Sequence, residues 1–149
     1  MKTQRLISIA LICLSLLLTT RNARAQVYPV VAYAQVTGRQ QGNFTGNTTI
    51  PGFGGQIALI NAGVSVEGHG RFYIQLYPGA SNAQFEKAFS NNEVLTRVFI
   101  QMVKYENGQV VPKAYKTYEL KNAAIYTIKA TTPGYSITFT AGQIDVNNL

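Results

Sequence analysis

Alternation of apolar and polar residues recurs along most of the chain beyond residue 26. It constrains the fold most, because a period of two belongs to half-buried β-strands. The pattern is clearest in Gly70–Tyr77, where Phe72, Ile74 and Leu76 share one face. The other segments of this kind are 27–36, 56–66, 96–105, 115–120, 123–130 and 135–146. The sequence therefore predicts a mainly all-β domain of six to seven antiparallel strands.

One short α-helix is expected after the strand at Gly70–Tyr77. Ser81 lies three residues before Gln84, which is the spacing of a capping box. The apolar stripe of the helix is formed by Phe85, Ala88 and Phe89. The polar run 90–92 is expected to end the helix, whose phenylalanines would pack on a sheet or across the mouth of a barrel. Strands and helix together predict a small β-barrel or β-sandwich with a single short helix.

Glycine, asparagine and proline mark the expected turns. Asn107-Gly108 is the strongest short hairpin signal, in which both residues take positive φ. Pro112 places its segment at a sheet edge or in a connection, because proline cannot donate to a strand ladder. The sequence 132–134 is expected to turn the chain between the last two strands, and Gly63 predicts a β-bulge.

A polar, glycine-rich stretch, Arg39–Gly55, is expected to form a long loop. It contains five glycines and Pro51 within 17 residues. Loops of this length are unusual in compact domains and often serve a function or contact a partner. A loosely held surface loop is the alternative, and the residues alone leave both interpretations open.

The first 25 residues have the pattern of a secretory signal peptide. A basic start precedes an apolar segment at 6–18, about 13 residues long, and Ala23-Arg24-Ala25 supplies the small-x-small cleavage pattern. This predicts cleavage between Ala25 and Gln26, a signal peptide at 1–25 and a single domain at 26–149. The alternatives are a buried helix or an uncleaved anchor, although about 20 apolar residues are needed to span a bilayer. The expected location is periplasmic or secreted, with membrane contact only during export.

The side chains available after residue 25 argue against catalysis. Nine basic and six acidic residues remain there, a net charge of +3, which is weak evidence for nucleic-acid binding. The acidic residues are scattered, so no general acid–base pair is indicated. The single histidine, His69, is expected in a turn or cap, because a metal site needs further ligands at fixed spacing. We therefore expect a non-enzymatic protein without a metal or other cofactor and without a nucleic-acid partner.

Tyr115 and Tyr118 flank Lys116, which is one arrangement of a stacking platform for single-stranded nucleic acid or sugar. The interpretation that we favour places these tyrosines on a strand face or at an interface. A ring with an apolar body and a polar tip suits both settings.

Four segments, in order, resemble the haemolysin-coregulated protein (Hcp) family, the tube subunits of type VI secretion. The first is AYAQVTG, Ala32–Gly38, which fits the opening strand and glycine turn of the family. The second is GQIALINAGVSV, Gly55–Val66, with Gly-Val-Ser as in the family's second strand. The third is HGRFYIQLYPGASNAQF, His69–Phe85, which is similar to the family's His-Gly-x-Phe strand and short helix. The fourth, Tyr115–Val146, resembles the C-terminal strand pair.

The resemblance implies a small β-barrel with one flanking helix. It also implies that the chain is its own partner, in a six-membered ring built by edge-to-edge strand contact around a channel. Secreted cargo and other secretion components are the further partners it implies. The loop Arg39–Gly55 would help to stack one ring on another. The candidate residues for ring stacking are Asn43, Phe44, Thr45, Pro51 and Phe53, and the candidate interface aromatics are Tyr115 and Tyr118.

The family's tube subunits assemble in the cytoplasm and carry no signal peptide. A signal peptide on this chain therefore predicts an exported relative that keeps the ring fold. The alternative function is a secreted monomeric β-sandwich that binds a carbohydrate, a peptide or a surface ligand. The oligomeric state of the processed protein distinguishes the two hypotheses.

Overall fold

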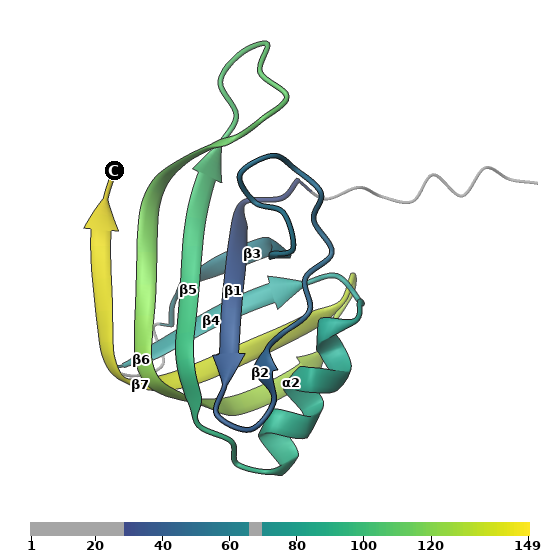
Figure 1. Cartoon of the computed structure of the whole chain (residues 1–149), viewed down its shortest axis with the longest axis vertical. Helices are drawn as coiled ribbons and strands as arrows, with labels where there is room; N and C mark the ends of the chain where they lie inside the picture. Colours follow the sequence, from purple (N-terminus) through teal and green to yellow (C-terminus); the bar gives the residue numbers. More distant parts are fainter. Residues whose placement is uncertain (1–28, 66–69) are drawn as a thin grey trace, which may run out of the picture.

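The computed structural model of the chain describes residues 29–65 and 70–149. Their helix and strands are, in chain order, β1 Ala32–Gly38, β2 Gly42–Asn43, β3 Ile57–Val64, β4 Arg71–Leu76, α2 Ser81–Ser90, β5 Leu95–Lys104, β6 Lys113–Ala130 and β7 Tyr135–Asn148 (Figure 1). The sequence-based expectation of a mainly β fold with one short helix in this region is confirmed.

The strands form a closed antiparallel barrel. Their order is β2-β1-β3-β4-β7-β6-β5, and a further pairing of β1 with β5 closes the circle. Six strands make the barrel, while β2 is a short addition that pairs only with the end of β1. Of the two architectures that the sequence left open, the barrel is therefore the one formed.

The hairpin of β6 and β7 is longer than the sequence suggested. The segments 115–120 and 123–130, expected as separate strands, are parts of the single strand β6. Asn122 marks the junction with a φ of 49°, a left-handed conformation that asparagine tolerates. Both long strands bend across the molecule in Figure 1, so that each contributes to both sides of the barrel.

Apolar side chains from all sides fill the barrel. The largest aromatic rings buried there are Phe72, Phe85 and Phe139, each at most 1% exposed. Burying a side chain of this size stabilises the fold by about 1.5–3 kcal/mol. In β4, Phe72, Ile74 and Leu76 point inward, as their alternation predicted.

The helix α2 packs its apolar side on the barrel, but its start differs from the expectation. Ala80, the residue before it, already has helical φ and ψ, and no side chain caps the helix. Ser81 is therefore inside the first turn, and the side chain of Gln84 accepts a hydrogen bond from the Thr45 N–H at 2.7 Å. The predicted capping box is wrong, because the chain enters the helix one residue earlier. The predicted burial of the stripe holds for Phe85 and Ala88, whereas Phe89 is 42% exposed.

Of the four predictions about turns, connections and bulges, two are wrong and two are confirmed. Residues 105–112 join β5 to β6 as a longer connection, in which Gly108 has positive φ and Asn107 does not. The two-residue hairpin is therefore absent, and Pro112 lies in the connection as expected. The register shift of β3 lies between residues 59 and 61, not at Gly63. The turn at 132–134 is present, with the Thr131 N–H donating to the Gly134 carbonyl.

Three sequence-based predictions lie outside the described residues. These are the signal peptide at 1–25, its cleavage between Ala25 and Gln26, and the turn or cap role of His69. Within the described ranges, no helix has both the length and the hydropathy needed to cross a bilayer.

Candidate assembly surface

The loop Arg39–Gly55 folds back over the outer face of the barrel. Tyr33 points outward from β1, and the ring of Phe53 stacks on it with centroids 4.4 Å apart. Both side chains are buried, Tyr33 at 0% and Phe53 at 6% exposure. Partly buried residues around this pair include Ile50 of the loop and Ala114 of β6. The loop thus builds a second small apolar cluster outside the barrel.

Phe44 anchors the first part of the loop to the main core. Its ring meets that of Phe85 edge-on, with centroids 4.9 Å apart. The Phe44 N–H donates to the Val36 carbonyl at 2.8 Å, and the following residue, Thr45, donates to the Gln84 side chain. These contacts connect the loop to both β1 and α2.

A buried carboxylate, Glu93, holds the start of the loop. It is 2% exposed and accepts hydrogen bonds from the Gln40 N–H at 2.6 Å, the Gln41 N–H at 3.0 Å and the Gln41 side chain at 2.8 Å. Burial raises the pKa of this carboxyl, but the Gln41 and Gln40 donors and nearby Lys87 outweigh it and lower the pKa below its ordinary value. The sequence analysis missed this residue, since nothing local pairs Glu93 with the loop.

Glycine is required where the loop crosses back on itself. A Cβ on Gly46 would collide with the backbone of Gln56. The two chain segments approach this closely because the N–H groups of Asn47 and Thr48 both donate to the Gln56 carbonyl at 3.2 Å. The glycines of this stretch therefore shape a packed loop.

The five candidate stacking residues divide into two groups. Phe44 and Phe53 are buried and hold the loop on its own barrel, whereas Asn43, Thr45 and Pro51 are exposed. Only the exposed three are available to a second molecule.

A recess of about 300 Å³ lies between this loop and the outer faces of β1 and β5. Thr37, Arg97 and Gln56 are among its lining residues. The side-chain oxygen of Gln56 is buried there without a hydrogen-bond partner in the described structure.

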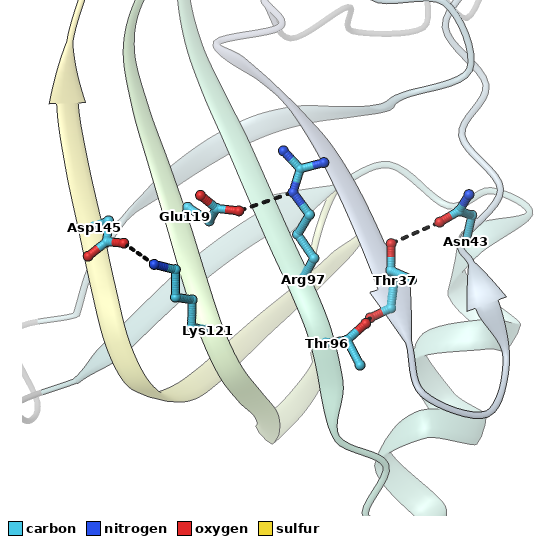
Figure 2. Close-up of polar contacts among 7 residues, drawn as sticks. All are labelled: Thr37, Asn43, Thr96, Arg97, Glu119, Lys121 and Asp145. Carbon is cyan, nitrogen blue, oxygen red and sulfur yellow. Dashed lines mark hydrogen bonds and ion pairs between the residues drawn. The ribbon is translucent and has the colours of Figure 1, made fainter.

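A row of polar side chains crosses the outer face from β2 to β7, as Figure 2 shows. Thr37 donates to Asn43 at 2.8 Å, Arg97 pairs with Glu119 at 3.1 Å, and Lys121 pairs with Asp145 at 2.7 Å. The Lys121 hydrogen bond lowers the pKa of Asp145, and the same bond raises the pKa of Lys121. Both ion pairs are substantially exposed, so each contributes little to folding.

The two candidate interface tyrosines differ in how far they are exposed. Tyr115 is 40% exposed. Tyr118 packs against the barrel core, with its ring centroid 4.8 Å from that of Phe72. The register of β5 and β6 shifts between Met102 and Val103, which leaves Tyr115 as the extra residue of a β-bulge in β6. Of the two tyrosines, Tyr115 is therefore the one that is exposed enough to meet a partner.

The C-terminal half of β7 has one edge without a strand neighbour among the described residues. β4 pairs with β7 only over 135–140, and the Ala141 N–H then donates to the Gly70 carbonyl. β6 continues to pair with the other edge as far as Asn148. In Figure 1 this yellow segment is the outermost strand of its side of the barrel. Such an edge is a template for pairing with another chain.

In the described part of the chain, no group of three or more His, Cys, Asp or Glu residues lies close enough to hold a metal ion. Burial is the main cause of a raised pKa at Tyr33, helped by the Tyr105 hydroxyl 3.5 Å away. That phenol belongs to the cluster under the loop and therefore has a packing role.

Several solved structures with a similar fold are Hcp proteins. The secreted protein Hcp3 from Pseudomonas aeruginosa is 23% identical, with a TM-score of 0.62 over 78% of this chain and 98% of its own. Another Hcp protein is 14% identical, with a TM-score of 0.66 over 81% of this chain and 100% of its own. A type VI secretion system effector from Yersinia pestis is 11% identical, with a TM-score of 0.60 over 79% and 98%.

Comparisons of the sequence itself give no match, either to a family model or to a curated protein. The likeness therefore lies in the fold, and it extends over nearly the whole length of these three matched chains. The Hcp resemblance noted in the sequence is confirmed at this level: the chain has the fold of the Hcp proteins.

Proposed function

We propose that this chain is a non-enzymatic structural subunit that assembles with copies of itself into a ring, and that it is exported by an N-terminal signal peptide. The observation that carries the proposal is the Hcp fold, which spans about four-fifths of the chain. By the same resemblance, the ring has six members. The exposed edge of β7 supports the proposal, since strand pairing between copies would cover it.

The backbone groups on this edge can be assigned from the end of the strand. The Leu149 N–H donates to the Tyr115 carbonyl at 3.0 Å, so Leu149 and Tyr115 of β6 form a hydrogen-bonded pair. Hydrogen-bonded and non-bonded pairs alternate along an antiparallel ladder. The N–H groups of Val146 and Asn148 therefore point away from β6, toward a neighbouring molecule.

Proline at Val146 tests this edge. It removes one outward donor without removing a bond to β6. We expect light scattering to show a ring for the unchanged protein and monomers for Val146→Pro, with circular dichroism spectra that match. Val110→Pro is the matched control, because Val110 lies in the connection and is 87% exposed; this variant should still assemble.

A Val146→Pro variant that forms rings as well as the unchanged protein would contradict the role of the edge. If proline unfolds the barrel, Val146→Lys gives the same test, because a charged side chain on an edge discourages strand pairing without removing a backbone donor.

Export is tested separately. The full 149-residue chain is produced in a bacterial host with a Sec pathway, and the product is weighed by mass spectrometry in each cell fraction. We expect a periplasmic or secreted product that begins at Gln26. An unprocessed chain confined to the cytoplasm would contradict export.

The loop contributes the second contact of the proposal. Asn43, Thr45 and Pro51 would touch the next ring, while Phe44 and Phe53 hold the loop in place. A loop fixed on its own barrel loses little conformational entropy when it meets a partner, which favours assembly.

A further inference from the structure

The Asn107-Gly108 dipeptide lies in the connection 105–112, which extends beyond the ends of β5 and β6 in Figure 1. It is the only asparagine-glycine pair in the sequence. The pairing of β5 with β6 ends at Lys104 and Lys113, so the dipeptide stays outside the strand ladder. Both of its residues are exposed. The pair is therefore open to solvent at a tip of the molecule.

Few contacts hold these two residues. The Gln109 N–H donates to the Glu106 carbonyl at 2.9 Å, which closes a turn around them. Among the described residues, the Asn107 side chain and the Gly108 N–H have no hydrogen-bond partner. Exposed segments with so few bonds open locally at little cost in free energy. The backbone around Asn107 can therefore rotate while the barrel stays folded.

We propose that Asn107 is a site of spontaneous deamidation, which converts it to aspartate and isoaspartate. The Gly108 backbone nitrogen gives up its proton to solvent base and attacks Cγ of Asn107. The new bond between this nitrogen and Cγ closes a cyclic imide. The bond from Cγ to the side-chain nitrogen breaks, and that nitrogen leaves as ammonia with one proton from solvent. Glycine permits the attack because it has no Cβ to crowd its nitrogen or to restrict the backbone.

Water then opens the imide. It adds to one of the two imide carbonyls, the bond from that carbon to the Gly108 nitrogen breaks, and a proton returns to this nitrogen. Attack at the side-chain carbonyl gives aspartate. Attack at the main-chain carbonyl gives isoaspartate, in which the chain continues through Cγ. Water is the only co-reactant, and no oxidant or reductant takes part.

The modification changes both the charge and the backbone of this tip. It replaces a neutral amide by a carboxylate next to Glu106, whose side chain pairs with Lys113 at 3.0 Å. Isoaspartate also lengthens the main chain within the turn. All reacting groups belong to one molecule, so this inference does not depend on ring formation or on export.

Two other exposed asparagines provide controls in the same chain. Asn43 is followed by Phe44, and its side chain accepts a hydrogen bond from Thr37 at 2.8 Å. Asn122 is followed by Ala123 and lies within β6. In both cases the next residue has a Cβ that crowds the attacking nitrogen, and a hydrogen bond or strand pairing restricts the asparagine. Both should keep their amides longer than Asn107 does.

The test follows the protein, as a host processes it from the full chain, during incubation at pH 7.4 and 37 °C. Samples are digested at mildly acidic pH, the peptides are weighed by mass spectrometry, and chromatography separates aspartate from isoaspartate. Asn107 should lose its amide about tenfold faster than Asn43 or Asn122. Both aspartate and isoaspartate should form at position 107.

Three variants test the chemistry. Gly108→Ala should slow the loss about tenfold, because the added methyl group crowds the attacking nitrogen. Asn107→Gln should stop it, because the longer side chain closes a less favourable ring. Gln109→Ala is the matched control: Gln109 is exposed and the variant keeps its backbone N–H, so the rate at Asn107 should be unchanged. Thermal unfolding confirms that each variant is folded.

The inference is overturned if Asn107 keeps its amide as long as Asn43 and Asn122 do, or if Gln109→Ala slows the loss as much as Gly108→Ala does. Loss of the amide without isoaspartate would exclude the cyclic imide. A synthetic peptide of residues 105–112 gives the rate for a free chain. A loss about a hundredfold slower in the folded protein than in this peptide would show that the fold protects the pair.

Discussion

The ring of Phe53 lies on the ring of Tyr33 with an angle of 27° between their planes, although 20 positions separate the two residues in the chain. This contact holds the glycine-rich loop on the outer face of the barrel. It also leaves the exposed loop residues in fixed positions, where a second molecule can meet them.

Replacing Phe53 by alanine should destabilise the fold by about 3 kcal/mol, the low end of the range for a buried phenylalanine, because this cluster is small. Urea denaturation measures the loss. Phe89→Ala is the matched control, since Phe89 is 42% exposed, and it should cost about 1 kcal/mol or less. Equal losses in the two variants would show that the stacked pair does not hold the loop.

Because of Glu93, the free energy of unfolding should depend on pH. Its folded-state pKa lies below the value of about 4.3 for an unfolded chain, so the unfolded state takes up the proton first. The stabilisation is therefore complete above that unfolded value and is lost as the pH falls through the folded pKa. Glu93→Gln should cost about 1.5–3 kcal/mol at pH 7 and flatten the acid side of the stability profile.

Urea midpoints from pH 3 to pH 7 measure this profile. Glu106→Gln is the control, because Glu106 pairs with Lys113 on the surface at 3.0 Å. A Glu93→Gln profile as steep as that of the unchanged protein would contradict the role assigned to the buried carboxylate.

Gly46→Ala should cost about 3 kcal/mol, because its Cβ would collide with the Gln56 backbone and one of the two segments would have to shift. Gly54→Ala is the matched control in the same loop, since a Cβ there meets nothing within 4 Å. Thermal unfolding should place the control within a few degrees of the unchanged protein. Two equally stable variants would show that the loop does not cross Gln56 as closely as the structure has it.

The sequence predicted the parts of the fold that depend on local periodicity. Alternation located β4 and its inward side chains, and the apolar stripe located α2. The loop anchors were beyond this reasoning, because stacking of Phe53 on Tyr33 and the bonds from Gln41 to Glu93 join distant segments. The local signal also failed at Asn107-Gly108, where Gly108 has the positive φ of a tight hairpin but Asn107 does not.

The candidate assembly surface likewise depends on contacts between distant segments of the chain. The different exposure of Tyr115 and Tyr118 did not follow from the sequence, because it depends on the register of β5 and β6, which shifts beside Tyr115. The free edge of β7 did not follow, because it depends on where β4 ends relative to its partner.

The ion pair of Arg97 with Glu119 should contribute about 0.2–1 kcal/mol, because both side chains are well exposed. A double-mutant cycle with Arg97→Gln and Glu119→Gln measures this coupling, which should shrink further in 0.5 M NaCl as the charges are screened. A coupling of several kcal/mol that persists in high salt would contradict the exposed geometry.

The central claim is that the protein assembles with copies of itself through the uncovered edge of β7. A native mass spectrum of the processed protein tests it most directly, because it counts subunits in one measurement. The account predicts a single closed oligomer of six times the subunit mass. A monomer that persists at high micromolar concentration would contradict it.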